Sequence, residues 1–378
     1  MNSTNPPVTW EQIAADGAAR TGWLNTPHGR FRTPMFMPVG TRATVKTVDC
    51  EDLEAIGAGV ILANTYHLML RPGSELIRDM GGIHGFMGWE RGVLTDSGGF
   101  QIFSLDPRID EEGARFRSVY DGRFVTMTPE DSIRIQQEIG ADIAMALDVC
   151  VGLPSPREVV EREMRRTLRW AERCLAAHDR SDQALFGIVQ GGADPELRAE
   201  SAEETAAMGF PGFGIGGLAV GESAEERNAA LEVVSRHLPA GKPRYVMGLG
   251  DPEGLLDAIA RGVDMFDCVI PTRLARHGRV LTADGDYNLK RAEFAADGCP
   301  LEEGCGCPTC SRYSRSYLRH LLGVKEMTGY RLVTIHNIWY LVRLMESARA
   351  AIEQGRFEAF AAEARARRAV SQQSSPSA

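Results

Sequence analysis

The stretch Leu185-Phe186-Gly187-Ile188-Val189-Gln190-Gly191-Gly192 joins a short apolar run to a polar, glycine-rich end. An apolar run of this length that is bounded by glycines is typical of a buried β-strand. The same pattern recurs along the chain, and it predicts eight strands at 35–39, 59–62, 93–95, 143–147, 185–189, 213–216, 245–248 and 265–270.

Helix-like stretches separate these strands. Thr128-Pro129-Glu130-Asp131 has an N-cap residue, a proline at the first helical position and acids in the first turn. Further crossover helices are predicted at 157–178, 196–208, 223–237 and 252–261. Eight such alternations predict an α/β fold, a (β/α)8 TIM barrel. The alternative is an open doubly wound sheet, although no GxGxxG motif follows the first strand.

The predicted organisation places most of the 378 residues in one domain. Residues 1–20 form an N-terminal lead-in, and 21–365 form the TIM-barrel domain. That domain includes a zinc-binding insertion near the C-terminus at 277–340. A β-hairpin around Asp121-Gly122 is expected within 105–127. Residues 366–378, which end in the small polar stretch SQQSSPSA, are expected to be a disordered tail.

Charge and hydropathy narrow the class of protein. The net charge of −9 argues against non-specific coating of nucleic acid, but it leaves room for a local basic patch. No run of 18 apolar residues is present, and the N-terminus lacks the pattern of a secretory signal. We therefore expect a cytoplasmic protein without a membrane span.

Polar residues follow several of the predicted strands. Asp96, Asp148 and Gln190 each come directly after a strand, and Asp267 lies within the last one. Barrel enzymes carry their chemistry at these strand ends, whereas a lone aspartate there can simply cap a helix. Asp264 begins its strand, so we expect it at the opposite face with a structural role.

Paired carboxylates suit chemistry at a sugar carbon, because one can attack the anomeric carbon while the other transfers a proton. A carboxylate can also accept the adjacent N–H donors of guanine, and glycines allow the backbone to approach a flat base. These residues alone predict a barrel enzyme with several acidic groups.

Cys305, Cys307 and Cys310 lie within six positions, and His336 follows. Three thiolates and an imidazole suit one tetrahedral zinc ion per chain, and four protein ligands indicate a structural ion. Cys299 lies outside this spacing. His67 is expected to be a hydrogen-bonded loop residue, and nothing in the sequence activates Cys150 or Cys268 as a nucleophile.

Several motifs together resemble one family. DSGGFQ (96–101), GIVQGG (187–192), GGLAVGE (216–222), YVMGLG (245–250), DMFDCVIPTR (264–273) and CGCPTC (305–310) with His336 are similar to motifs of the bacterial-type tRNA-guanine transglycosylases, which form the queuine tRNA-ribosyltransferase family. They occur in the family's order over residues 30–365.

The resemblance implies a role for each matching residue. Asp267 would be the nucleophile and Asp96 the general acid and base, also in contact with the base. The remaining members of the predicted base site are Phe100, Asp148, Gln190, Gly217, Leu218, Tyr245 and Met247. Phe100 and Met247 would sandwich the ring, and Leu218 would offer its carbonyl with Glu222 behind it. Arg273 and Arg276 would bind tRNA phosphates.

The resemblance also implies the partners. The substrates would be tRNAs with G-U-N anticodons and 7-aminomethyl-7-deazaguanine, in a step of queuosine biosynthesis. Val220 and Cys150 match the bacterial form, which takes this small base. A homodimer would pack through the zinc segment, with Tyr317 and His320 at the interface. Val149 departs from the family, which usually has glutamate at that position.

Two other functions compete with base exchange. A non-catalytic paralogue that binds tRNA would be expected to lack the acidic pair, yet Asp96 and Asp267 are both present. An unrelated barrel hydrolase with a catalytic zinc would need an open metal site with three protein ligands, whereas four are available.

Overall fold

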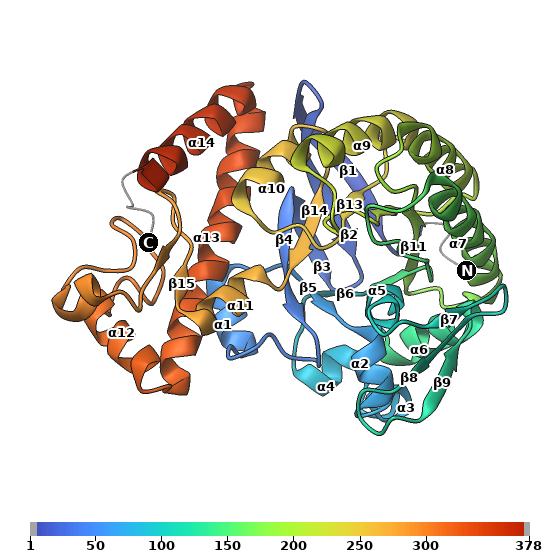
Figure 1. Ribbon diagram of the computed structural model, residues 1–378, viewed down its shortest axis with the longest axis horizontal. Helices are drawn as coiled ribbons and strands as arrows, with labels where there is room; N and C mark the ends of the chain where they lie inside the picture. The colour runs from blue at the N-terminus through green and yellow to red at the C-terminus, as the bar shows by residue number, and fades with distance from the viewer. Residues whose placement is uncertain (1–5, 374–378) are drawn as a thin grey trace.

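The computed structural model describes residues 6–373 and contains a closed eight-stranded parallel barrel (Figure 1). The barrel strands are β4 (Met35–Gly40), β5 (Val60–Ala63), β6 (Gly92–Thr95), β10 (Ile143–Met145), β11 (Ala184–Val189), β12 (Phe213–Ile215), β13 (Arg244–Val246) and β14 (Met265–Cys268). All eight predicted strands are confirmed. Met265 of β14 pairs with Met35 of β4, and this closure excludes the open doubly wound sheet.

Helices surround the barrel, and their starts follow the sequence signals. The larger ones on its outside are α1 (Cys50–Ile56), α6 (Pro129–Ile139), α7 (Arg157–Ala177), α8 (Pro195–Ala207), α9 (Ala224–His237) and α10 (Pro252–Ile259). Thr128 caps α6, since its hydroxyl accepts from the Asp131 N–H while the Asp131 carboxylate accepts from the Thr128 N–H. The predicted crossover helices are confirmed, with small differences at their ends.

Shorter helices lie in the loops that follow β5 and β6. They are α2 (Thr65–Leu70), α3 (Ser74–Asp79), α4 (Gly82–Met87) and α5 (Gly99–Phe103). The insertion after α5 is a three-stranded antiparallel sheet of β7 (Arg108–Ile109), β8 (Ala114–Arg117) and β9 (Phe124–Met127). The predicted hairpin is its β8–β9 pair, and Gly122 occupies the turn with a φ of 71°.

An antiparallel sheet closes the N-terminal end of the barrel. It consists of β1 (Thr9–Asp16), β2 (Ala19–Thr26) and β3 (Gly29–Thr33), and Trp10 and Leu24 pack into the same cluster as the barrel interior. The predicted boundary after residue 20 is wrong, because β2 crosses it. Asp264 lies at this end, where Arg20 Nε donates to it at 3.0 Å and the Arg244 N–H at 2.7 Å. This confirms its structural role.

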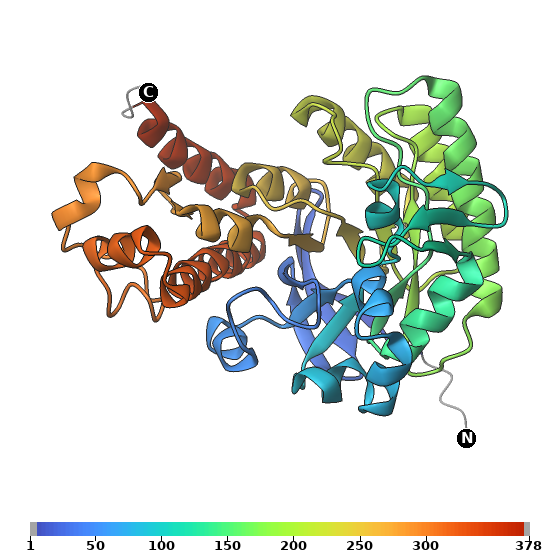
Figure 2. The same cartoon turned by 60° about the horizontal axis from the view of Figure 1, so that its bottom comes forward.

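The segment after β14 leaves the barrel and returns to it (Figures 1 and 2). It runs through α11 (Ile270–His277), β15 (Arg279–Val280), β16 (Tyr287–Asn288), a 3-10 helix (Ala292–Ala296), α12 (Arg315–Gly323) and α13 (Met327–Glu353). Helix α13 packs against β4, α1 and α10. It therefore occupies the position of the eighth barrel helix, and the metal-binding segment lies between the eighth strand and that helix.

The C-terminal helix corrects one prediction. Helix α14 (Phe357–Gln373) continues through most of the stretch 366–378 that was expected to be disordered. Its Phe357 and Ala361 are buried, and this apolar anchorage explains why the helix extends toward the polar end of the chain. Residues 374–378 lie outside the described residues. Among the helices of residues 6–373, none is long and apolar enough to cross a membrane.

Candidate active site and metal centre

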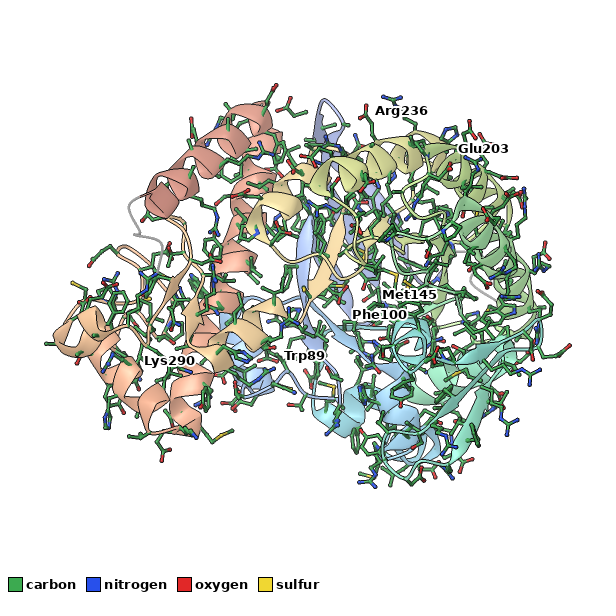
Figure 3. All side chains as sticks on the ribbon, viewed as in Figure 1. Trp89, Phe100, Met145, Glu203, Arg236 and Lys290 are labelled. Atoms are coloured by element: carbon green, nitrogen blue, oxygen red, sulfur yellow. The ribbon has the colours of Figure 1, made fainter. Side chains whose placement is uncertain are left out.

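Apolar side chains fill the barrel interior, so the candidate site lies at the C-terminal mouth. Met37, Met145 and Met265 are fully buried in the interior cluster, and Figure 3 labels Met145 among the barrel strands. Asp96 and Gln190 directly follow β6 and β11, and Asp148 lies three residues after the end of β10. Because parallel strands present their carboxyl ends at one face, these groups gather there.

Asp96 is buried and accepts hydrogen bonds from residues that directly follow β5, the preceding barrel strand. Asn64 Nδ2 donates to its Oδ2 at 2.6 Å, and the Thr65 N–H donates to Oδ1 at 2.9 Å. The Gly98 N–H adds a longer bond of 3.2 Å. Burial, together with the negative charge of Asp267, outweighs these donors and raises the pKa of Asp96 to about 7. The carboxyl can therefore exchange a proton near neutral pH.

Asp267, on β14, is the second buried carboxylate. The Tyr245 hydroxyl donates to its Oδ1 at 2.5 Å and the Gly248 N–H at 2.8 Å. Burial raises its pKa, and these two donors oppose that rise. Tyr245 is fully buried, and its hydroxyl contacts this carboxylate in addition to lying in the predicted base site.

Asp148 and Gln190 form a second polar group at the mouth. Gln190 Nε2 donates to Asp148 Oδ2 at 2.7 Å, and Ser97 Oγ donates to Oδ1 at 2.9 Å. Burial raises the pKa of Asp148, against the bonds from Gln190 and Ser97. Gly217 lies against Gln190, and a Cβ at Gly217 would fall 2.2 Å from Gln190 Oε1. The structure thus brings together three of the predicted base-site residues.

The loop after β12 is held by Glu222. Its carboxylate accepts from the backbone N–H groups of Ala219 and Val220, the latter at 3.0 Å. Ala219 has a φ of 62°, a left-handed conformation that these two bonds help to maintain. Leu218 is buried directly before this turn. Glu222 therefore fixes the backbone of the loop that directly follows Leu218.

Two side chains of the predicted base site remain partly accessible. Phe100, on α5, is 53% exposed, and Figure 3 shows it in front of the barrel strands. Met247, directly after β13, is half-buried and packs on the interior cluster. An accessible aromatic ring and a thioether at the mouth are surfaces on which a flat base can stack.

The predicted phosphate-binding arginines lie on α11, directly after Asp267. Arg273 is exposed, whereas Arg276 is half-buried and donates to the Thr272 carbonyl at 2.9 Å. Burial lowers the pKa of Arg276, with a further contribution from Arg273. Arg273 is thus the more accessible cation of the pair.

Three further residues, which are not among the predicted site residues, contact this site. Asn64 and Ser97 bond to the carboxylates of Asp96 and Asp148. Arg198, on α8, donates to carbonyls at the ends of β11 and β12. Asn64 and Ser97 lie just after barrel strands, so their position at strand ends could have identified them from the sequence. Arg198 lies inside a helix and carries no such mark.

The structure also places four other residues that the sequence singled out, Val149, His67, Cys150 and Cys268. Val149 is buried in the core, and its N–H donates to Thr167 Oγ1 at 3.0 Å, so an apolar residue fits this place. His67 lies on α2 and not in a loop as expected, but it is hydrogen-bonded, since its Nδ1 is 3.3 Å from the Tyr120 hydroxyl. Burial raises the pKa of the Cys150 and Cys268 thiols to about 12, so neither is activated as a nucleophile.

Cys305, Cys307, Cys310 and His336 converge as the spacing predicted, while Cys299 is exposed. His336 Nδ1 lies 3.7, 3.6 and 3.4 Å from the three sulfur atoms in that order. Ligands of a tetrahedral zinc ion, with bonds of about 2.3 Å to sulfur and 2.0 Å to nitrogen, would be separated by about 3.5 Å. His336 Nε2 bonds to the Leu281 carbonyl at 2.8 Å and is thereby oriented. The cluster fits a closed zinc site.

Comparison with known proteins extends over nearly the whole chain. The family model described as Queuine tRNA-ribosyltransferase matches residues 16–370. A queuine tRNA-ribosyltransferase of Moorella thermoacetica is 53% identical over 362 residues, which cover 95% of this chain and 97% of the relative. One from Thermus thermophilus is 54% identical over 364 residues, which cover 96% of this chain and 94% of the relative.

Proposed function

Because this chain belongs to the queuine tRNA-ribosyltransferase family, we propose that it exchanges guanine at the wobble position of G-U-N tRNAs by double displacement. The observation that carries the proposal is the pair of buried carboxylates at the barrel mouth, Asp96 and Asp267. Their environments differ, since Asp267 accepts from a tyrosine hydroxyl and Asp96 has a pKa of about 7. Two carboxylates whose surroundings shift their pKa values differently can take different roles, one as nucleophile and one as acid and base.

In the first step, the Asp267 carboxylate attacks C1′ of the wobble nucleotide. The bond from C1′ to N9 breaks, its electron pair passes to the base, and protonated Asp96 gives the base a proton. In the second step, the incoming base returns a proton to Asp96, its nitrogen attacks C1′, and the bond from C1′ to Asp267 breaks. The pKa of Asp96 suits both transfers, because the two protonation states are both populated near neutral pH.

The base would lie between Phe100 and Met247, with its polar edge toward Asp148, Gln190 and Gly217. The Asp148 carboxylate suits the adjacent N–H donors of guanine and deazaguanine. The incoming base is 7-aminomethyl-7-deazaguanine, whose aminomethyl group would donate to the Leu218 carbonyl. Val220 and Cys150 support the choice of this small base.

The tRNA and a second copy of the chain complete the proposal. The reacting nucleotide must leave its stack to reach the buried carboxylates, and Arg273 and Arg276 would hold its flanking phosphates. Two chains would pack through the zinc segment at Tyr317 and His320, and Tyr317 is 44% exposed. Zinc, bound by the three thiolates and His336, would fix α13 to the cysteine loop and take no part in the exchange.

The test uses unmodified tRNA with a G-U-N anticodon, radiolabelled guanine and the zinc-loaded protein. We expect label to enter the tRNA with the native protein but not with Asp267→Asn. Asp264→Asn is the matched control, because it changes a buried aspartate at the opposite end of the barrel. No incorporation by well-folded native protein would favour a non-catalytic tRNA-binding paralogue.

A further inference from the structure

Arg198 is a fully buried arginine whose hydrogen-bond partners are backbone carbonyls. Its Nε donates to Gly192 O at 2.7 Å, and Nη1 donates to Val189 O at 3.0 Å and to Gly216 O at 2.8 Å. Its Nη2 donates to Gly217 O at 3.1 Å. Burial lowers the pKa of the guanidinium to about 10, so it remains charged at neutral pH. Among residues 6–373 no carboxylate bonds to this guanidinium, and burying a cation without such a partner is costly to the folded state.

The four carbonyls belong to two loops of the candidate base site. Val189 and Gly192 flank Gln190 at the end of β11, and Gly216 and Gly217 follow β12. One guanidinium therefore fixes Gln190 relative to Gly217. Gln190 and Gly217 are in close contact, because a Cβ added at Gly217 would not fit beside Gln190 Oε1.

The bond to Gly216 O also acts on the base site electrically. Gly216 O and the Gly217 N–H belong to one peptide group, and in a trans peptide they point in opposite directions. The Gly217 N–H is thus directed away from the cation. Donation to the carbonyl polarises the whole peptide, which makes this N–H a stronger donor.

We propose that Arg198 is a positioning residue for base exchange, which aligns Gln190 with Gly217 and strengthens the Gly217 N–H toward the departing base. This inference rests on the proposed function. When the bond from C1′ to N9 breaks, the electron pair raises the negative charge on the base, including its carbonyl oxygen. A polarised amide with a fixed cation behind it stabilises that charge more in the transition state than in the bound nucleotide.

The test compares Arg198→Met and Arg198→Lys with Arg244→Met. Arg244 is also buried, donates to the carbonyls of Leu238 and Gly262, and lies at the start of β13, at the other end of the barrel. We expect Arg198→Met to slow guanine release from tRNA in a single turnover about 10- to 100-fold, with little change in tRNA affinity. Folded Arg244→Met should stay within about twofold of the native rate. Arg198→Lys keeps the charge but cannot hold four carbonyls, so its rate should lie between those of Arg198→Met and the native protein.

A second measurement separates this inference from the proposed function. Hydrogen exchange at residues 216–218 and the affinity for free guanine need no turnover, and we expect faster exchange and weaker binding in both Arg198 variants. Equal losses of rate in Arg198→Met and Arg244→Met would overturn the positioning role. Hydrogen exchange at residues 216–218 that stays at the native rate in the Arg198 variants would overturn it as well. If the native protein releases no guanine, the proposed function fails. Hydrogen exchange at residues 216–218 and the affinity for free guanine then decide the role of Arg198. If Arg198→Met does not fold, Arg198→Lys carries the same comparison.

Discussion

The hydroxyl of Tyr245 donates a 2.5 Å hydrogen bond to Oδ1 of Asp267, and both side chains are buried. The two residues are on neighbouring barrel strands, β13 and β14. The bond favours the charged form of a carboxylate whose burial favours the neutral form. Tyr245 thereby orients the proposed nucleophile and favours its ionised form.

Tyr245→Phe removes this donor and leaves the Gly248 N–H on Asp267. The pKa of Asp267 should rise further, so the acidic limb of the kcat/KM profile should move to higher pH. We expect kcat/KM at neutral pH to fall about 10-fold or more, as for the loss of a hydrogen bond to a charged group. The measurement is the rate of guanine exchange from about pH 5 to pH 9, a range that covers both limbs of the profile. An acidic limb at its native position would show that the bond does not tune the nucleophile.

The first half-reaction should lose rate above about pH 7. Asp96 must be protonated to serve as the acid, and its pKa of about 7 places the loss of that proton there. Guanine release in a single turnover should fall about tenfold per pH unit on the alkaline side. Asp96→Asn should remove this limb and lower the rate by about 10²–10⁴-fold. A pH-independent native rate between pH 7 and 9 would assign the proton transfer to another group.

Asn64→Ala tests the environment of the same acid. Asn64 Nδ2 donates to Asp96 at 2.6 Å, and this bond favours the charged carboxylate. Its loss should raise the pKa of Asp96 by about one unit, if the bond contributes on the order of 1.4 kcal/mol. The alkaline limb of guanine release should then move to higher pH. Ser104→Ala, which removes an exposed hydroxyl bonded to the Gln101 carbonyl, should leave the limb in place.

Gly217→Ala should weaken base binding through a steric clash. Gly217 has a φ of 64°, and an added Cβ would meet Gln190 Oε1 at 2.2 Å. Gly209→Ala is the matched control, because its φ is 85° but no atom lies within 4 Å of the added Cβ. Backbone strain should cost each variant about 1 kcal/mol of stability, and the clash with Gln190 should add to this loss in Gly217→Ala alone. We expect only Gly217→Ala to raise KM for guanine, and equal KM values in the two variants would argue against a base contact at Gly217.

Cys310→Ser should abolish zinc binding, and Cys299→Ser should not. The native protein and Cys299→Ser should each contain one zinc per chain by elemental analysis. Cys310→Ser should contain none and should unfold at a lower temperature, because structural zinc contributes directly to folding. Loss of exchange activity should follow the loss of folding. One tightly bound zinc in Cys310→Ser would place the metal elsewhere.

Much of this arrangement could be predicted from the residues in order. The eight apolar runs alternate with helical stretches, and this alternation predicts the barrel, with an open doubly wound sheet as the alternative. The positions of Asp96, Asp148 and Gln190 directly after strands then place them at one mouth. The spacing of Cys305, Cys307 and Cys310 predicts a metal site because thiolates so close in sequence can reach one ion.

The rest was decided by contacts between residues far apart in the chain. The proton affinity of Asp96 depends on its burial and on Asp267, and Arg198 reaches its carbonyls only because α8 packs beside the ends of β11 and β12. The place of α13 as the eighth barrel helix likewise follows from packing on β4, α1 and α10. Local sequence determined which elements form and where the polar groups begin. Tertiary structure decided their partners and their charge, because desolvation and hydrogen bonding depend on the neighbours that folding brings together.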